Sequence, residues 1–332
     1  VQQAALEPAA DKHCLPIVTP TPSEKYPTPA ALPMQWNLMV EHALAPWGKG
    51  SIQKFQIDKA EKRMFDTRTG VGFRIKIIDN RLYLKDMLSL WFLREYTPAR
   101  VVLLLETLKR YKIPNLDAVW NQGDYPVMIH PRNVQHMTDL YQDMKPPPVF
   151  SPTASINSFD IPWPDFSWMP PKGVHDLKTP RWPQAQRQIT LSANQIKWED
   201  KIPLAAFTGN MQAEPRQRLI EVAENHPEAM FVNQIFTKSP TGRKSCTAEG
   251  LASKGGFQKD KCGMSFEEMC QFKYLLNVGS NGYANKFKYL FLCKSVVIHV
   301  RYGSPNWEFF EFMFMPGIHY YVVDYPEDIP AA

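Results

Sequence analysis

From about Ile189 onward, short apolar runs typical of strands alternate with amphipathic runs typical of helices. One passage joins "PLAAFTGN", "RQRLIEVAENH" and "MFVN", and the next joins "KYLLNV", "NKFKYLFLC" and "SVVIHV". A third is expected to lead from a helix at "NWEFFEFMF" to a strand at "HYYVV". Strands that alternate with helices form parallel sheets covered on both faces. The pattern therefore predicts a Rossmann-like α/β domain over residues 189–332.

The preceding residues predict a second α/β unit. Helices are expected near residues 34–45 and 52–65, followed by a hairpin that turns at Asp79-Asn80. A further helix is expected to begin at Pro98, with Thr97 as its N-cap, and to lead into a short buried strand. A chain of 332 residues exceeds the size at which one core usually stops growing. Two domains, 34–188 and 189–332, are therefore predicted to face a cleft.

Proline marks two irregular parts of the chain, which has 30 prolines in all. The tract "PIVTPTPSEKYPTPAALP" predicts that residues 1–33 are an extended stem or linker, because proline excludes helix and central strand. Residues 142–183 mix proline with tryptophan and predict rigid loops around a cleft. The loops near residues 163–182 are expected to shape the side that binds the acceptor.

A net charge of +5 is too small to favour binding to duplex DNA, yet it suits an anionic small ligand. No run approaches the roughly 20 apolar residues of a membrane span, so any membrane attachment is expected to lie outside this sequence. The five cysteines leave two alternatives open. Two disulfides plus one further thiol would fit a secretory compartment, whereas five reduced thiols would fit the cytosol. No Cys/His spacing indicates zinc.

Two loops that follow predicted strands carry the residues a phosphate group needs. Ligands of open α/β sheets bind beyond the carboxyl ends of the strands, where glycines and cations can surround an anion. The first loop holds Gly209, Asn210 and Arg216, and the second holds Gly279, Ser280, Gly282, Tyr283, Asn285 and Lys286. Neither loop matches GxGxxG or GxxxxGK[ST], and no D-x-D triplet is present to hold a metal. The cations Arg216 and Lys286 are therefore predicted to bind a diphosphate.

Several blocks together resemble glycosyltransferase family 90, which includes protein O-glucosyltransferases and capsule-associated xylosyltransferases. They are "NRLY", "IPNLDAVWNQGDYP", "PVFS", "FDIPWPDFSWM", "AAFTGNMQAEPRQRLI", "KYLLNVGSNGYANKFKYLFLCKSVVIHV" and "SPNWEFFEFMFMPGIHYYVV". The resemblance runs from about Ile52 to Val323. It implies a GT-B fold, in which two Rossmann-like domains face a central cleft, and inverting transfer from a UDP-sugar without an obligatory metal. It departs at Thr208, where many relatives have arginine, and in the segment 246–262, which resembles an insertion.

The resemblance also implies roles for single residues. Asp124 matches the general base, Asn210 a donor contact, and Arg216 and Lys286 the ligands of the diphosphate. Cys270 and Cys293 match a disulfide pair, and the pairing of Cys246 with Cys262 stays open.

Elementary chemistry agrees with a base at Asp124, since an inverting transfer needs one carboxylate to take the acceptor proton. A turn-capping role for Asp124 is the alternative. Asp160 is a second carboxylate candidate, equally suited to capping a turn. Glu308 is predicted to accept hydrogen bonds from ribose, or else to lie on a helix surface.

The sequence therefore predicts a UDP-sugar-dependent transferase of the endoplasmic reticulum or Golgi lumen. It would move xylose or glucose to a hydroxyl of a glycoprotein, peptide or glycan, with no cofactor and no nucleic acid partner. Two alternatives stay open: a non-catalytic glycan- or peptide-binding relative, and a cytosolic nucleotide-binding enzyme with reduced cysteines.

Overall fold

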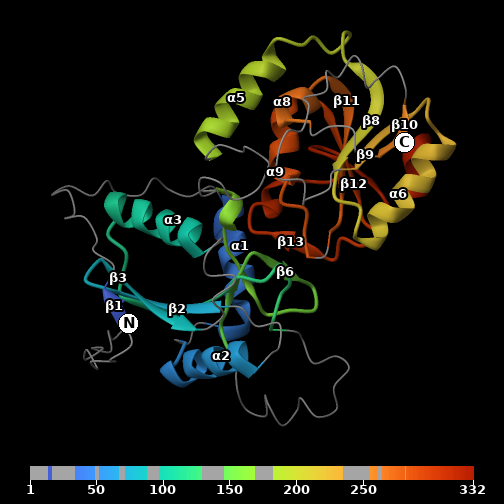
Figure 1. The fold of residues 1–332 in the computed structure, drawn as a ribbon. Coiled ribbons are helices and arrows are strands. Elements are labelled where there is room, and N and C mark those ends of the chain that lie inside the picture. Colours follow the sequence, from blue (N-terminus) through green and yellow to red (C-terminus); the bar gives the residue numbers. More distant parts are fainter. Residues whose placement is uncertain are drawn as a thin grey trace, which may run out of the picture.

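A computed structural model describes residues 14–16, 34–48, 52–66, 72–87, 97–128, 146–168, 182–234, 255–259, 264–280 and 282–332. The described strands form two six-stranded sheets, one from each half of the chain (Figure 1). A separate ribbon pairs β6 (Thr153–Ser155) of the first half with β13 (Asn306–Glu308) of the second. Among the described residues, no helix is long and apolar enough to cross a bilayer.

The first sheet is mixed. Its strand order is β1 (Cys14–Pro16), β3 (Arg81–Met87), β2 (Gly72–Ile78), β4 (Leu116–Asn121), β5 (Phe150–Ser151) and β7 (Ile161–Pro162). Neighbours from β1 to β4 run antiparallel, and β4, β5 and β7 run parallel. The hairpin between β2 and β3 turns at Asp79 and Asn80, whose φ angles of 49° and 62° suit a two-residue type I′ turn. The hairpin prediction is confirmed.

Helices cover both faces of this sheet, on either side of β2 in Figure 1. They are α2 (Lys54–Asp66) and α3 (Thr97–Arg110), preceded along the chain by α1 (Met34–Leu44). Leu104 and Leu108 of α3 pack on Phe73 and Ile75 of β2. On the opposite face, Met64 of α2 belongs to a separate apolar cluster. The three helices agree with the ranges predicted from sequence.

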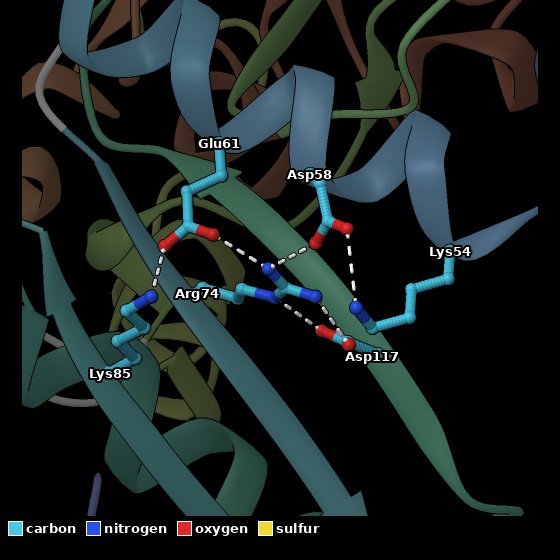
Figure 2. A network of polar contacts seen from close by, with 6 residues as sticks. All are labelled: Lys54, Asp58, Glu61, Arg74, Lys85 and Asp117. Atoms are coloured by element: carbon cyan, nitrogen blue, oxygen red, sulfur yellow. Dashed lines mark hydrogen bonds and ion pairs between the residues drawn. The ribbon is translucent and has the colours of Figure 1, made fainter. Parts of the chain in front are cut away.

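Arg74, between Phe73 and Ile75, points to the α2 face because successive strand residues alternate in direction. Its guanidinium donates to both oxygens of Asp117 (2.7 and 2.6 Å), to Glu61 (2.6 Å) and to Asp58 (2.9 Å). Figure 2 shows this network, in which Arg74 joins α2 to β4. Burial alone would lower the pKa of Arg74, but the carboxylates outweigh burial and raise it. The network pins α2 to the sheet.

The second sheet is entirely parallel. Its order is β10 (Gly256–Lys259), β9 (Met230–Gln234), β8 (Ile202–Gly209), β11 (Phe272–Val278), β12 (Val296–Val300) and β14 (Tyr321–Val323). In chain order this reads 3-2-1-4-5-6, the arrangement of a doubly wound Rossmann fold. The predicted α/β, Rossmann-like character is confirmed for this sheet.

Helices also cover both faces of the second sheet (Figure 1). One face carries α6 (Glu214–Asn225), and the other carries α5 (Trp182–Asn194), α8 (Phe266–Met269) and α9 (Phe287–Leu290). Phe207 of β8 packs with Leu219 of α6, whereas the preceding Ala206 packs with Leu290 of α9. This alternation explains why the strands are apolar nearly throughout.

A disulfide joins Cys270, after α8, to Cys293, after α9, with a sulfur–sulfur distance of 2.11 Å. This pair was implied by the family resemblance and is confirmed. The buried Lys201 donates to the carbonyl oxygens of both cysteines, at 2.9 Å for Cys293. The predictions for Cys246, Cys262 and most of 1–33 lie outside the described residues, as does 169–181 of the tryptophan-rich loops.

The predicted helix at "NWEFFEFMF" is wrong. Asn306–Glu308 is the strand β13, and only Glu311–Met313 forms a short 3₁₀ turn. The backbone of β13 pairs with β6, a partner more than 150 positions away along the chain. Aromatic residues favour extended backbone where they can pack, and Trp307 is the aromatic residue of β13. Long-range pairing therefore outweighed the local helical pattern.

Candidate active site

The candidate site lies at the carboxyl ends of β8 and β11, neighbours at which the strand order reverses. Chain order runs outward from β8 to β10 on one side and from β11 to β14 on the other. Loops therefore diverge at this point, and open α/β sheets bind ligands in the resulting crevice. The two predicted phosphate loops follow these two strands.

Arg216, in the first turn of α6, connects the ends of both strands. Its Nε donates to the carbonyl oxygen of Gly279 (2.9 Å), Nη2 to Val278 (3.3 Å), and Nη1 to Asn210 (3.0 Å). The side chain is buried, and this burial lowers its pKa to about 10. Three nitrogens of the Arg216 guanidinium thus donate to backbone carbonyl oxygens, and the group has five N–H bonds in all, so it can also donate to a ligand.

Lys286 reaches the same place from the second loop. Its Nζ donates to the carbonyl oxygen of Thr208 (2.8 Å) and lies 3.4 Å from the ring centre of Phe207. The guanidinium carbon of Arg216 lies 5.3 Å from the same ring, so two buried cations share it. Burial and then the charge of Arg216 hold the pKa of Lys286 well below its usual range.

No carboxylate among the described residues forms an ion pair with Arg216 or Lys286. Two buried like charges without a counterion are unfavourable, because burial and mutual repulsion both penalise the charged forms. A bound anion would remove both penalties.

Lys288, only two positions further, has the opposite environment. Its Nζ lies 3.6 Å from Glu308 and 3.8 Å from Asp165, and it donates to the carbonyl oxygen of Asn285 (2.7 Å). Burial alone would lower the pKa of Lys288, but these carboxylates overcome it and the pKa is raised. Residues two apart on a helix point different ways, which separates the two lysines. Among the described residues, carboxylates neutralise Lys288, whereas none pairs with Lys286.

Asp124 lies in an exposed turn that follows the carboxyl end of β4, an inner strand of the first sheet. Asn121 braces this turn, since its amide donates to the carbonyl of Tyr125 (2.7 Å) and accepts from the N–H of Gly123 (2.8 Å). Thr153 donates to the carbonyl of Asp124 (3.2 Å). The predicted base is therefore held by backbone contacts on both sides.

Asp160 supports the continuation of the same turn. Its carboxylate accepts from the N–H groups of Val127 (2.9 Å) and Met128 (2.7 Å) and from the hydroxyl of Ser151. Burial raises the pKa of Asp160 to about 6. Of its two predicted roles, these contacts match turn capping.

The loop with Lys286 comes directly against the Asp124 turn. A Cβ added to Gly282 would lie 1.9 Å from the carbonyl oxygen of Asp124, so only glycine permits this approach. Asn306 secures the loop by donating to the carbonyl of Gly282 (2.8 Å). The structure thereby brings Asp124 of the first half beside the loop that ends at the two buried cations.

Comparison with known proteins decides the family. The model of "Glycosyl transferase family 90" matches residues 33–330, nearly the whole chain. The chain belongs to glycosyl transferase family 90. The resemblance inferred from the sequence blocks is confirmed.

Curated relatives agree with the family 90 assignment. The chain is 28% identical to "O-glucosyltransferase rumi" of Drosophila melanogaster over 276 residues, which is 82% of the chain and 61% of the relative. It is 26% identical to "Protein O-glucosyltransferase 1" of Homo sapiens over 293 residues, 85% of the chain and 64% of the relative. The chain thus spans about three fifths of the length of the curated relatives it matches.

Other predicted site residues lie in the same two loops. The carboxamide of Asn210 accepts from the N–H of Gln212 (2.7 Å), which shapes the first loop. A Cβ at Gly209 would lie 3.6 Å from Nζ of Lys286. Ser280 follows Gly279 and is partly buried. The roles of these residues in donor binding stay predictions.

Glu308 is buried beside Lys288 and lies on a strand where a helix was expected. Burial and neighbouring carboxylates hold its pKa well above the usual range, although Lys288 opposes this. Its predicted contact with ribose stays a prediction.

Sequence reasoning missed Asp165 and Lys288. Asp165 in "WPDFSW" reads as a turn residue, and Lys288 reads as an exposed helix position, yet both are buried. Only the apolar residues around Lys288 in "NKFKYLFLC" hinted at its burial. Within the described residues, no group of three His, Cys, Asp or Glu side chains could hold a metal ion.

A small pocket of about 10 Å³ is lined by residues of β11, β12, α9 and the second loop. Asn277 Oδ1 and Ser304 Oγ line it and are buried without a hydrogen-bond partner among the described residues. Glu311 is also in its wall, where burial raises its pKa to about 7. The pocket has room for about one water molecule, which could bond to these polar groups.

Proposed function

We propose that this chain transfers glucose or xylose from a UDP-sugar to a hydroxyl of a glycoprotein, peptide or glycan acceptor, with inversion and without a metal. The observation that carries the proposal is the buried pair of Arg216 and Lys286 at the reversal of the second sheet. Its support is that no carboxylate of the described residues pairs with either cation, and that a diphosphate carries the opposite charge.

The two cations differ in chemistry, and a diphosphate uses both. A guanidinium offers directed N–H donors to phosphate oxygens, whereas an ammonium supplies a compact charge. Negative charge builds on the leaving UDP as the glycosidic bond breaks, so cations held there bind the transition state more tightly than the ground state. Arg216 and Lys286 would thereby do what a metal does in other diphosphate sites.

Asp124 is the proposed general base. Its carboxylate would take the proton of the acceptor hydroxyl as the oxygen attacks the anomeric carbon opposite UDP. The support is positional: Gly282 brings the donor loop against the Asp124 turn, and Asp124 is exposed enough to meet an acceptor.

The same proposal includes a GT-B arrangement, with the two sheets facing a cleft that receives donor and acceptor. It also includes a secretory compartment, which the Cys270–Cys293 disulfide supports because such bonds persist in oxidising surroundings. The names of the relatives, both O-glucosyltransferases, favour glucose over xylose as the donor sugar.

Calorimetric titration with UDP in EDTA tests the donor site. We expect UDP, UDP-glucose and UDP-xylose to bind, NAD not to bind, and added Mn²⁺ to change the affinity for UDP little. Binding that requires Mn²⁺, or no binding of UDP at all, would contradict the proposed site.

Asp124→Asn tests catalysis separately. The variant should keep the affinity for UDP and lose turnover of UDP-glucose, measured as UDP release with water as acceptor. UDP binding without turnover in the wild-type protein, with peptide or glycan acceptors also present, would instead favour the non-catalytic binding relative.

A further inference from the structure

One hydrogen bond clips the donor loop to the first half of the molecule. The hydroxyl of Tyr283 donates to Oδ2 of Asp165 at 2.5 Å, across 118 positions of sequence. Tyr283 lies between β11 and α9, and Asp165 lies just after β7 of the first sheet. The contact therefore spans the two sheet systems.

Contacts other than the one with Tyr283 also hold Asp165 in place. Its other oxygen, Oδ1, accepts from the N–H (3.1 Å) and hydroxyl (2.6 Å) of Ser167, and the carboxylate is 1% exposed. Lys288 lies 3.8 Å away and balances its charge. A carboxyl group held in one orientation makes a strong partner for a phenol.

Tyr283 stays the donor in this pair. Its burial, and after that the charges of Asp165, Asp124 and Glu308, hold the pKa of the phenol well above its usual range. A second tyrosine, Tyr289 of α9, donates to the carbonyl of Ser167 at 2.8 Å. Two tyrosines of one segment thus hold the same short turn.

Tyr283 lies close along the chain to both parts of the candidate site. It directly follows Gly282, whose backbone touches Asp124, and it precedes Lys286 by three residues. A chain this short transmits any displacement of Tyr283 to both neighbours.

We propose that Tyr283 and Asp165 are positioning residues for sugar transfer, which fix the loop 282–286 so that Asp124 and the diphosphate cations keep their mutual distance. This inference rests on the proposed function. It assigns the Tyr283 hydroxyl to a link between the two halves of the chain, and it leaves donor binding to Arg216 and Lys286.

The test compares Tyr283→Phe with Tyr274→Phe, whose ring packs on Trp198 near the opposite end of the sheet. We expect Tyr283→Phe to lower kcat for UDP-glucose by about tenfold or more, because small misplacements are costly in catalysis. The Kd for UDP should change by less than about threefold, and Tyr274→Phe should match wild type in both. Unchanged kcat, or a fall in UDP affinity equal to the fall in kcat, would overturn the proposal.

Asp165 supplies a second test. Asp165→Asn has one accepting oxygen where Asp165 uses two, so it cannot accept from both Tyr283 and Ser167. It should lower kcat as Tyr283→Phe does, while the Kd for UDP changes by less than about threefold. Wild-type turnover in Asp165→Asn would contradict a positioning role.

Hydrogen exchange separates this inference from the proposed function, because it needs no nucleotide. In Tyr283→Phe, amide exchange in peptides covering 123–128 and 282–286 should rise relative to wild type and Tyr274→Phe. Faster exchange in Tyr283→Phe, together with no turnover of UDP-sugar by the wild-type protein, would support the positioning role of the Tyr283–Asp165 hydrogen bond and contradict only the proposed transferase activity. Unchanged exchange would contradict the proposal that the Tyr283–Asp165 hydrogen bond fixes the loop.

Discussion

The contact between Gly282 and the Asp124 turn allows a sharp test by Gly282→Ala. A Cβ at this position would lie 1.9 Å from the carbonyl oxygen and 2.4 Å from the carbonyl carbon of Asp124. Since real Cβ atoms stay at least 3.0 Å from such atoms, one backbone must move by about 1.1 Å, the difference between 3.0 and 1.9 Å. Neither side yields freely, because Asn306 holds Gly282 and Thr153 holds Asp124.

A displacement of this size acts directly on the proposed base. A 1 Å misplacement can cost about 100-fold in rate, which corresponds to about 2.7 kcal/mol of transition-state stabilisation. We expect kcat for UDP release from UDP-glucose to fall by about this factor. UDP affinity should change much less, because Arg216 and Lys286 keep their own backbone partners.

Gly48→Ala is the matched control. Gly48 has a positive φ of 61° and nothing within 4 Å of an added Cβ, so alanine there strains the backbone without any collision. It should lower thermal stability and leave kcat unchanged. Turnover of Gly282→Ala equal to wild type would refute the argument that this close approach sets the position of Asp124.

Three further outcomes are expected. Arg74→Met should lower the free energy of unfolding in urea by about 3 kcal/mol or more, since it leaves Asp117 and other carboxylates without their buried partner; a loss below about 1 kcal/mol would contradict the network's role. Binding of UDP should take up a proton wherever the pH lies above the depressed pKa of Lys286, because the bound anion raises that pKa, and the affinity should then fall as pH rises. Calorimetry in buffers of different protonation enthalpy measures the uptake, and Lys286→Met should abolish it. Cys293→Ala should cost about 3 kcal/mol by opening a link across 23 positions, and equal melting of oxidised and reduced wild type would argue against it.

Much of the second sheet could be predicted because its signals are local. Strand and helix patterns repeat within a few residues, and parallel strands of a doubly wound sheet bring their carboxyl ends to one edge. The expectation that the loops holding Arg216 and Lys286 meet followed from that rule, and the structure places both cations over the ring of Phe207. The hairpin at Asp79-Asn80 was equally local, since two adjacent residues had to accept positive φ.

The remaining features depend on partners that lie far away along the chain. β13 became a strand because β6 pairs with it, and the sequence around Glu308 carries no mark of that partner. Lys286 and Lys288 look alike in "NKFKY", yet one lies beside Arg216 and the other beside Asp165 and Glu308.

Sequence by itself determined the parallel sheet, the loops that end its strands, and the kinds of side chain available for an anion and a proton. Tertiary structure alone decided which lysine is neutralised, and which turn meets Gly282. The physical reason is that backbone preference acts over a few residues, whereas burial and charge depend on everything that packs nearby.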